Sequence, residues 1–246
     1  NNMWLTKARF PHSGFLEMDG GGTDYLLDYD LPFSNNDLKG STSRMRINNW
    51  QFEYRQVESF ENHKLQFDSI LMNKANHINT CRKGWGYYLD NKKMFLDAQN
   101  EWFYSEKENT VYIYTENGEI PENLVAGYIN HGIVFAKNTS HIKVEDLAFK
   151  FQVNTALQLD GVNKNISIQN CTFSNIGMHG IDGKNQCANI LIKNNTFNHV
   201  LGGGIRFIEV NNCEIVGNKI KNIGMQQGYG VDGVNGAVAI AIITDD

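Results

Sequence analysis

The residues able to do acid–base chemistry in the C-terminal half recur about one sequence repeat apart. Asp160 precedes Asp182 by almost one repeat, and Arg206 follows Asp182 by one full repeat. Two carboxyl groups can cleave a glycosidic bond when one protonates the leaving oxygen and the other attacks the sugar or activates water. An arginine next to one carboxylate keeps that carboxylate ionised. This spacing predicts that the residues share a surface, with Asp160 and Asp182 as the candidate catalytic pair.

A second chemistry fits the same part of the chain. A polysaccharide lyase needs a base that removes the proton beside a uronate carboxylate, and a cation that neutralises the enolate-like charge. His179, Lys184 and Arg206 are candidates for these roles, with acidic residues binding Ca²⁺. No aspartate cluster suited to calcium is evident, so hydrolysis is the favoured interpretation. The plainest alternative is structural, with Asp182 and Arg206 forming a cross-strand ion pair on an exposed sheet.

A repeat of 24 residues would bring these side chains together. Apolar residues align at alternate positions in each repeat, which is the pattern of short β-strands. The aligned columns are Gly132, Ala156, Gly180 and Gly204; Ile133, Leu157, Ile181 and Ile205; Ile142, Ile166, Ile190 and, after one deletion, Cys213; and Phe149, Phe173, Phe197 and Ile220. Each repeat therefore predicts three strands separated by bends, as in a right-handed parallel β-helix.

Asparagines support this interpretation. Two sets of asparagines align in successive repeats, once the one-residue deletion is allowed for. The first set is Asn165, Asn189 and Asn212, and the second is Asn195 and Asn218. Identical amides about 4.8 Å apart can donate to one another along a ladder. The sequence therefore predicts asparagine ladders at two corners of the β-helix.

The strand that opens each repeat is predicted to form the working face. Its outward side chains and their neighbours are expected to form one polar patch that could contact a sugar chain. The expected substrate-binding residues beside the catalytic pair are Gln158, His179, Lys184, Arg206 and Glu209. The glycine-rich segment 224–237 is expected to wall one end of the patch, since loops on a rigid scaffold often carry binding residues. Asp245 and Asp246 are candidates for a further acidic pair on the next turn.

The N-terminal half does not repeat. Segments 43–50, 51–60 and 63–71 alternate apolar and polar residues, and 101–104 and 110–114 flank a polar turn. These patterns predict a compact β-sandwich or barrel-like domain. Its aromatic residues Trp102, Phe103, Tyr112 and Tyr114 are candidates for a sugar platform, although packing in the core is the favoured interpretation.

Composition narrows the classes of partner. The formal net charge of −5 argues against a nucleic-acid partner, and no apolar run approaches the length of a membrane span. The four cysteines show no metal-binding or disulfide spacing, so we expect buried free thiols. The opening NNMWLTKARFP reads like the middle of a sequence, so we expect a piece of a longer, exported protein; the alternative is a complete cytoplasmic protein.

The order of segments resembles a known group. WLTKARFPHSG, the β-domain, GYYLDNKKMFLDAQNEWFYSEKENTVYIYTENG and the repeats are similar to bacterial right-handed parallel β-helix proteins of the carbohydrate-active kind. These include β-helical glycoside hydrolases of the β-xylosidase type, in which a β-domain interrupts the helix. The resemblance implies an all-β fold with residues 1–12 at the edge of the β-helix, 13–122 as the inserted domain and 123–246 as the β-helix. The turn departs from the group's LDAPGEWYYD at Gln99, Asn100 and Ser105.

The resemblance also implies a function. We expect an enzyme acting on polysaccharide or oligosaccharide, located in the periplasm, at the cell surface or outside a bacterium. No cofactor is implied apart from Ca²⁺ in a lyase. The alternative from another class is a non-catalytic glycan-binding or adhesin module.

Overall fold

The computed structural model describes residues 4–70, 79–119, 121–226, 228–229 and 237–243. The chain divides into two compact units, residues Asn1–Leu124 and Val125–Asp246. Within the described residues the helical elements are one turn of α-helix, α1 (Asn35–Leu38), and one 3₁₀ turn, η1 (Lys93–Phe95). Every other regular element is a β-strand, which confirms the predicted all-β class.

The first unit contains an eight-stranded sheet with the order β2-β9-β6-β7-β8-β5-β4, and β3 pairs with β9. Its strands are β2 (Arg9–Phe10), β3 (Leu16–Glu17), β4 (Gly20–Gly21), β5 (Tyr25–Leu27), β6 (Thr42–Arg46), β7 (Phe52–Glu61), β8 (Lys64–Phe67) and β9 (Gly86–Asp90). β6, β7 and β8 confirm the three alternating segments predicted from the sequence. The pairing is antiparallel throughout. Buried side chains from β7, β8 and β9 help to fill the core of this unit.

The first unit also contains a three-stranded sheet. It consists of β1 (Thr6–Lys7), β10 (Glu101–Ser105) and β11 (Thr110–Ile113), in the order β1-β10-β11. β10 and β11 form the predicted hairpin, in which Phe103 lies opposite Tyr112 with ring centroids 6.4 Å apart. β1 runs parallel to β10, so the segment before residue 12 pairs with strands of this unit.

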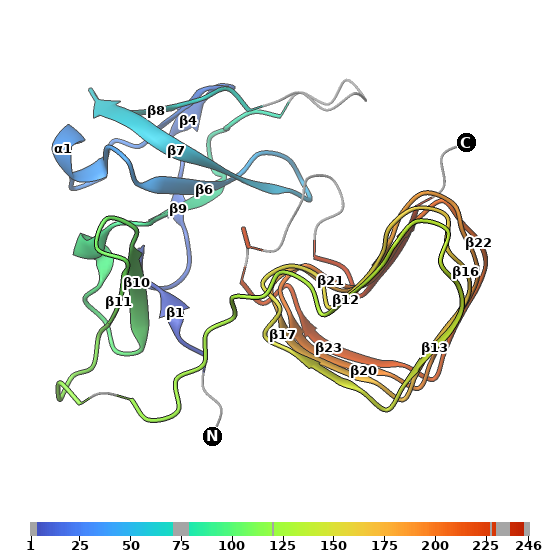
Figure 1. Ribbon diagram of the computed structural model, residues 1–246. Coiled ribbons are helices and arrows are strands. Elements are labelled where there is room, and N and C mark those ends of the chain that lie inside the picture. The colour runs from blue at the N-terminus through green and yellow to red at the C-terminus, as the bar shows by residue number, and fades with distance from the viewer. Residues whose placement is uncertain (1–3, 71–78, 120, 227, 230–236, 244–246) are drawn as a thin grey trace. The chain divides into compact units, whose positions relative to one another are not determined.

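The second unit is a parallel β-helix in which each turn adds strands to three sheets (Figure 1). The first sheet contains β12 (Ile133–Phe135), β15 (Leu157–Leu159), β18 (His179–Gly183), β21 (Gly203–Ile208) and β24 (Ile240–Ile243). The second contains β13 (Ser140–Glu145), β16 (Lys164–Gln169), β19 (Cys187–Lys193) and β22 (Val210–Val216). The third contains β14 (Ala148–Lys150), β17 (Thr172–Ile176), β20 (Thr196–Val200) and β23 (Lys219–Ile223). The strand pairing reproduces the 24-residue register, including the deletion that places Cys213 beside Ile190.

Stacked side chains form the core of the β-helix. The rings of Phe149, Phe173 and Phe197 lie parallel, with centroids 5.0 and 4.6 Å apart. Gly180 faces this column, and a Cβ at this position would lie 2.6 Å from the ring of Phe197. The glycine therefore leaves space for a ring that fills the narrow interior.

Both predicted asparagine ladders are present. Asn189 Nδ2 donates to Asn165 Oδ1 at 2.9 Å, and Asn212 Nδ2 donates to Asn189 Oδ1 at 2.7 Å. These three residues have φ angles between 54° and 56°, a left-handed conformation that asparagine tolerates well. The second ladder is more buried, because Asn195 accepts from the Cys171 N–H at 2.8 Å and donates to the carbonyl of Ile168. The buried ladder therefore satisfies backbone groups at a corner of the β-helix, whereas the exposed ladder joins side chains to one another.

Candidate functional site

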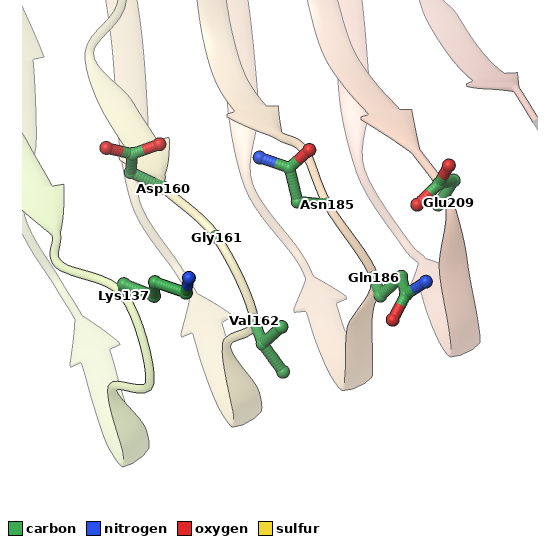
Figure 2. A pocket seen from close by; sticks show the side chains of 7 residues that line it. All are labelled: Lys137, Asp160, Gly161, Val162, Asn185, Gln186 and Glu209. Carbon is green, nitrogen blue, oxygen red and sulfur yellow. The ribbon is translucent and has the colours of Figure 1, made fainter.

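A cleft of about 340 Å³ lies at the corner where the chain leaves the first sheet of the β-helix. Successive turns contribute side chains to it just beyond β12, β15, β18 and β21 (Figure 2). The cleft is lined by Lys137, Asp160, Gly161, Val162, Asn185, Gln186 and Glu209. It has one basic and two acidic side chains.

The two acids of this cleft are Asp160 and Glu209. Asp160 directly follows β15 and Glu209 directly follows β21, which is two turns further along the axis. Strands of a parallel sheet are about 4.8 Å apart, so the two backbones are separated by about 10 Å. Asn185 lies between them in the row of side chains in Figure 2. Among the described residues, neither carboxylate forms a side-chain hydrogen bond or an ion pair.

Backbone hydrogen bonds hold both acids on the scaffold. The Asp160 N–H donates to the carbonyl of Phe135 at 2.9 Å, and the Glu209 N–H donates to the carbonyl of Ile243 at 2.8 Å. Asp160 is exposed and Glu209 is half-buried. Both carboxyl groups are therefore accessible on a rigid frame, an arrangement suited to holding reacting groups in place.

The corner itself requires an unusual backbone conformation. Gly161, Asn185 and Glu209 occupy equivalent positions in successive turns, with φ angles of 87°, 63° and 58°. Glycine and asparagine tolerate this left-handed region, whereas for other residues it costs about 1–2 kcal/mol. Gln186 is also left-handed, with φ of 63°. His141, Phe151 and His199 occupy the same region elsewhere in the β-helix, so the conformation is not confined to the cleft. At Glu209 it places a carboxylate at the opening of the cleft.

A second polar group lies on the first sheet itself. Arg206 donates to Asp182 through Nε at 2.8 Å and through Nη2 at 2.9 Å. The side chains are only 5% and 6% exposed, respectively, and the Lys184 ammonium lies 3.9 Å from Asp182 Oδ2. The register confirms that Gln158, Asp182 and Arg206 align across adjacent strands. Both oxygens of Asp182 are thus committed to a fork-shaped ion pair, which is the strongest form of this interaction.

His179 is buried in the same sheet, at the start of β18. Its Nδ1 accepts the N–H of Gly203 at 3.0 Å, so in the neutral ring the proton is on Nε2. The structure therefore divides the expected patch into two groups. Asp160 and Glu209 line the cleft, whereas Asp182, Lys184 and Arg206 form the ion-pair group.

Comparison with known proteins agrees with this architecture. Residues 131–241 match the sequence family described as "Right handed beta helix region". The C-terminal unit is a right-handed parallel β-helix. A solved structure of a protein called "Glycoside hydrolase" superposes with a TM-score of 0.60 at 14% sequence identity. The alignment covers 82% of this chain and 46% of that one, so the chain spans less than half the length of its structural relative. At this level of identity the likeness establishes a shared fold.

No curated protein sequence matches the chain significantly. In the described portion of the chain, no helix has the length and apolar character needed to cross a membrane.

Sequence reasoning missed five residues that line the cleft of the right-handed β-helix: Lys137, Gly161, Val162, Asn185 and Gln186. They lie one or two positions beyond the residues that were aligned as the opening strand of each repeat, where the strand has already ended. The equivalence of residues 137, 161, 185 and 209 in the 24-residue repeat was the signal that could have found them. Asp245 and Asp246 lie outside the described residues, as does part of segment 224–237.

Proposed function

We propose that this protein is a carbohydrate-active enzyme that hydrolyses glycosidic bonds, with Asp160 and Glu209 as its catalytic carboxyl groups. The observation that carries the proposal is the cleft in which these two acids face the same space from turns two apart. The fold shared with a protein called "Glycoside hydrolase" supports the same reaction class. The cleft opens along stacked turns, a shape suited to an extended sugar chain.

The separation of the acids indicates the course of the reaction. Inverting glycosidases leave about 6.5–9.5 Å between their carboxyl groups so that a water molecule fits beside the sugar, whereas retaining enzymes use about 5–5.5 Å. A backbone separation of about 10 Å, shortened slightly by side-chain rotation, matches the inverting arrangement. One carboxyl group protonates the leaving oxygen while the other removes a proton from the attacking water. The sugar carbon is then attacked from the face opposite the departing group.

The remaining cleft residues suit recognition of the sugar. Asn185 and Gln186 offer amide donors and acceptors for hydroxyl groups, and Lys137 supplies a cation at the same opening (Figure 2). The retaining pair expected from the sequence, Asp160 with Asp182, receives less support. Both oxygens of Asp182 are occupied by Arg206, so a nucleophilic role would require this buried ion pair to open.

The proposal is tested by measuring reducing sugar released from a panel of oligosaccharides and polysaccharides. We expect Asp160→Asn and Glu209→Gln each to lower turnover at least about 100-fold, the usual contribution of general acid–base catalysis. Glu214→Gln is the matched control, because Glu214 is an exposed carboxylate on β22 outside the cleft. Circular dichroism should show that all three variants keep the β fold.

Two results would contradict the proposal. Unsaturated sugar products would assign the protein to the lyases, and glycan binding without turnover would make it a binding module. The anomeric configuration of the first product, followed by NMR, separately tests inversion against retention.

A further inference from the structure

Three potential metal ligands converge in the first unit, from two segments that lie far apart in the sequence. His12 follows β2, whereas Asp97 and Glu101 lie just before and at the start of β10. One donor atom from each residue lies within 4.8 Å of the donors of the other two. His12 Nδ1 is 3.1 Å from Glu101 Oε1, and His12 Nε2 is 3.3 Å from Asp97 Oδ1.

Glu101 is the fixed member of this cluster. Its side chain is only 4% exposed, and the backbone N–H groups of Asp97 and Ala98 point to its Oε2 at 3.4 Å. Its own backbone continues the parallel pairing with β1 at Thr6. The other oxygen, Oε1, is thereby directed to His12. Outer contacts of this kind orient the ligands of metal sites in proteins.

The loop that carries His12 is also held in place. Arg9 Nε donates to the carbonyl of Pro11 at 2.8 Å, and its Nη2 donates to the carbonyl of Gly14. The Arg9 guanidinium lies 3.6 Å from the ring centroid of Tyr88, on the adjacent β9. The side chains of His12 and Asp97 are 48% and 59% exposed, so they can rotate and an ion can reach them from solvent.

The charge of the cluster matches a divalent cation. With a neutral imidazole, the two carboxylates carry a formal charge of −2, and within the described residues no lysine or arginine forms an ion pair with either. Ligands about 2.1 Å from a tetrahedral zinc ion lie about 3.4 Å from one another. The two histidine contacts use different ring nitrogens, and one metal ion can bind only one of them. With Nδ1 as the ligand, Glu101 Oε1 at 3.1 Å is already close to the required spacing, and rotation of the exposed Asp97 side chain would bring its carboxylate to the same ion.

We propose that His12, Asp97 and Glu101 bind a divalent transition-metal ion, with Zn²⁺ as the favoured occupant. Imidazole nitrogen and carboxylate oxygen are ligands that zinc accepts in sites with three protein ligands and one open position. Calcium is disfavoured because it takes six to eight oxygen ligands, and this cluster offers two carboxylates. The site ties the loop after β2 to the turn before β10, and it is independent of the cleft in the β-helix.

The test uses the full chain after treatment with a chelator and dialysis. Calorimetric titration with ZnCl₂ should show one equivalent bound, and a parallel titration with CaCl₂ should show no comparable binding. We expect His12→Gln and Asp97→Asn each to weaken zinc binding about tenfold or more. Both residues are exposed, so these variants should fold even where Glu101→Gln does not. His141→Gln is the matched control, because His141 is an exposed histidine of the β-helix.

Two further readouts are specific to this site. Co²⁺ should give a visible absorption spectrum in the wild-type protein that is lost in His12→Gln. Zinc should raise the melting temperature of the wild-type protein but not of the variants, because a ligand that binds only the folded chain stabilises it. The proposal is wrong if no saturable binding occurs, or if both variants bind zinc as tightly as the wild type. It is also wrong if His12→Gln destabilises the metal-free protein while zinc has no effect, since His12 would then be a protonated bridge between two carboxylates.

Discussion

Glu209 combines an accessible carboxylate with a left-handed backbone that favours glycine. At the equivalent position one repeat earlier the chain has Asn185, and two repeats earlier it has Gly161. The left-handed conformation costs about 1–2 kcal/mol for a side chain such as glutamate. The proposed catalytic role of the carboxylate offers one reason for glutamate at a position where glycine would fit the backbone better.

This reasoning predicts opposite effects on activity and stability. Glu209→Gly should remove activity at least about 100-fold while leaving the free energy of unfolding unchanged or raising it by up to about 1 kcal/mol, because the strain disappears and the added chain entropy offsets part of the gain. Glu209→Ala loses the same carboxylate but keeps the strain, so it should be the less stable variant. Urea denaturation of the two variants measures the difference. Equal stabilities would show that the backbone at residue 209 is not strained.

Asp182 and Arg206 illustrate the contrasting case of a buried pair. Asp182→Asn removes the carboxylate that accepts two hydrogen bonds from the buried Arg206, and breaking a buried pair in this way usually costs about 3–5 kcal/mol. We therefore expect a clearly lowered melting temperature, measured by circular dichroism. Arg206→Lys should also lose stability, because an ammonium cannot reproduce the two-pronged contact. An Asp182→Asn variant with wild-type stability and no activity would instead restore the catalytic role that the sequence predicted for Asp182.

At the scale of elements, the asparagine ladders hold the corners at which strands end. The buried ladder satisfies backbone groups inside the β-helix, whereas the ladder through Asn189 is exposed. The two ladders should therefore contribute unequally to stability, although their sequence pattern is the same.

Asn195→Ala should lower the free energy of unfolding by about 1–3 kcal/mol, because it leaves the Cys171 N–H and the Ile168 carbonyl without their partner. The comparison variant is Asn189→Gly, which keeps the left-handed backbone and removes exposed hydrogen bonds. It should cost less than about 1 kcal/mol. Chemical denaturation monitored by circular dichroism measures both values. If Asn189→Gly lowered the free energy of unfolding more than Asn195→Ala, burial would not determine how much each ladder contributes to stability.

At the scale of the whole molecule, both units carry buried thiols. All four cysteines are free. Burial raises the pKa of the Cys81 thiol to about 12, and burial with the nearby Cys187 raises the pKa of Cys213 to about 11. A thiol whose pKa is higher in the folded chain than in the unfolded chain stabilises the fold below the unfolded value of 9.0. That contribution is lost as the pH rises through the folded pKa.

We therefore expect the melting temperature to fall as the pH rises from about 9 to about 11, since each such thiol contributes a slope of up to about 1.4 kcal/mol per pH unit. Cys81→Ala removes one of these groups, so its melting temperature should change less steeply over the same range. Thermal melts at several alkaline pH values provide the measurement. An unchanged slope in Cys81→Ala would assign the alkaline sensitivity to other groups, such as Tyr87, whose pKa burial and Asp28 also raise.

The sequence by itself determined the β-helix, its repeat length and its corners. Apolar residues equivalent to Ile181 and to Phe173 occur every 24 residues. Within each repeat, the alternation of apolar and polar residues assigns each side chain to the inside or the outside of the β-helix. Asn189 and its counterparts mark turns because few other residues tolerate that backbone. These features are local or strictly periodic, so a one-dimensional pattern contains them.

Only the tertiary structure decided which polar residues work together. The alignment placed Asp160 and Asp182 on adjacent turns, but the fold commits Asp182 to Arg206 and leaves Asp160 in a cleft with Glu209. It likewise brings His12 to Glu101 across a long stretch of sequence without any repeat. Burial, side-chain direction and contacts between distant segments depend on how the elements pack, and residue spacing does not record that packing.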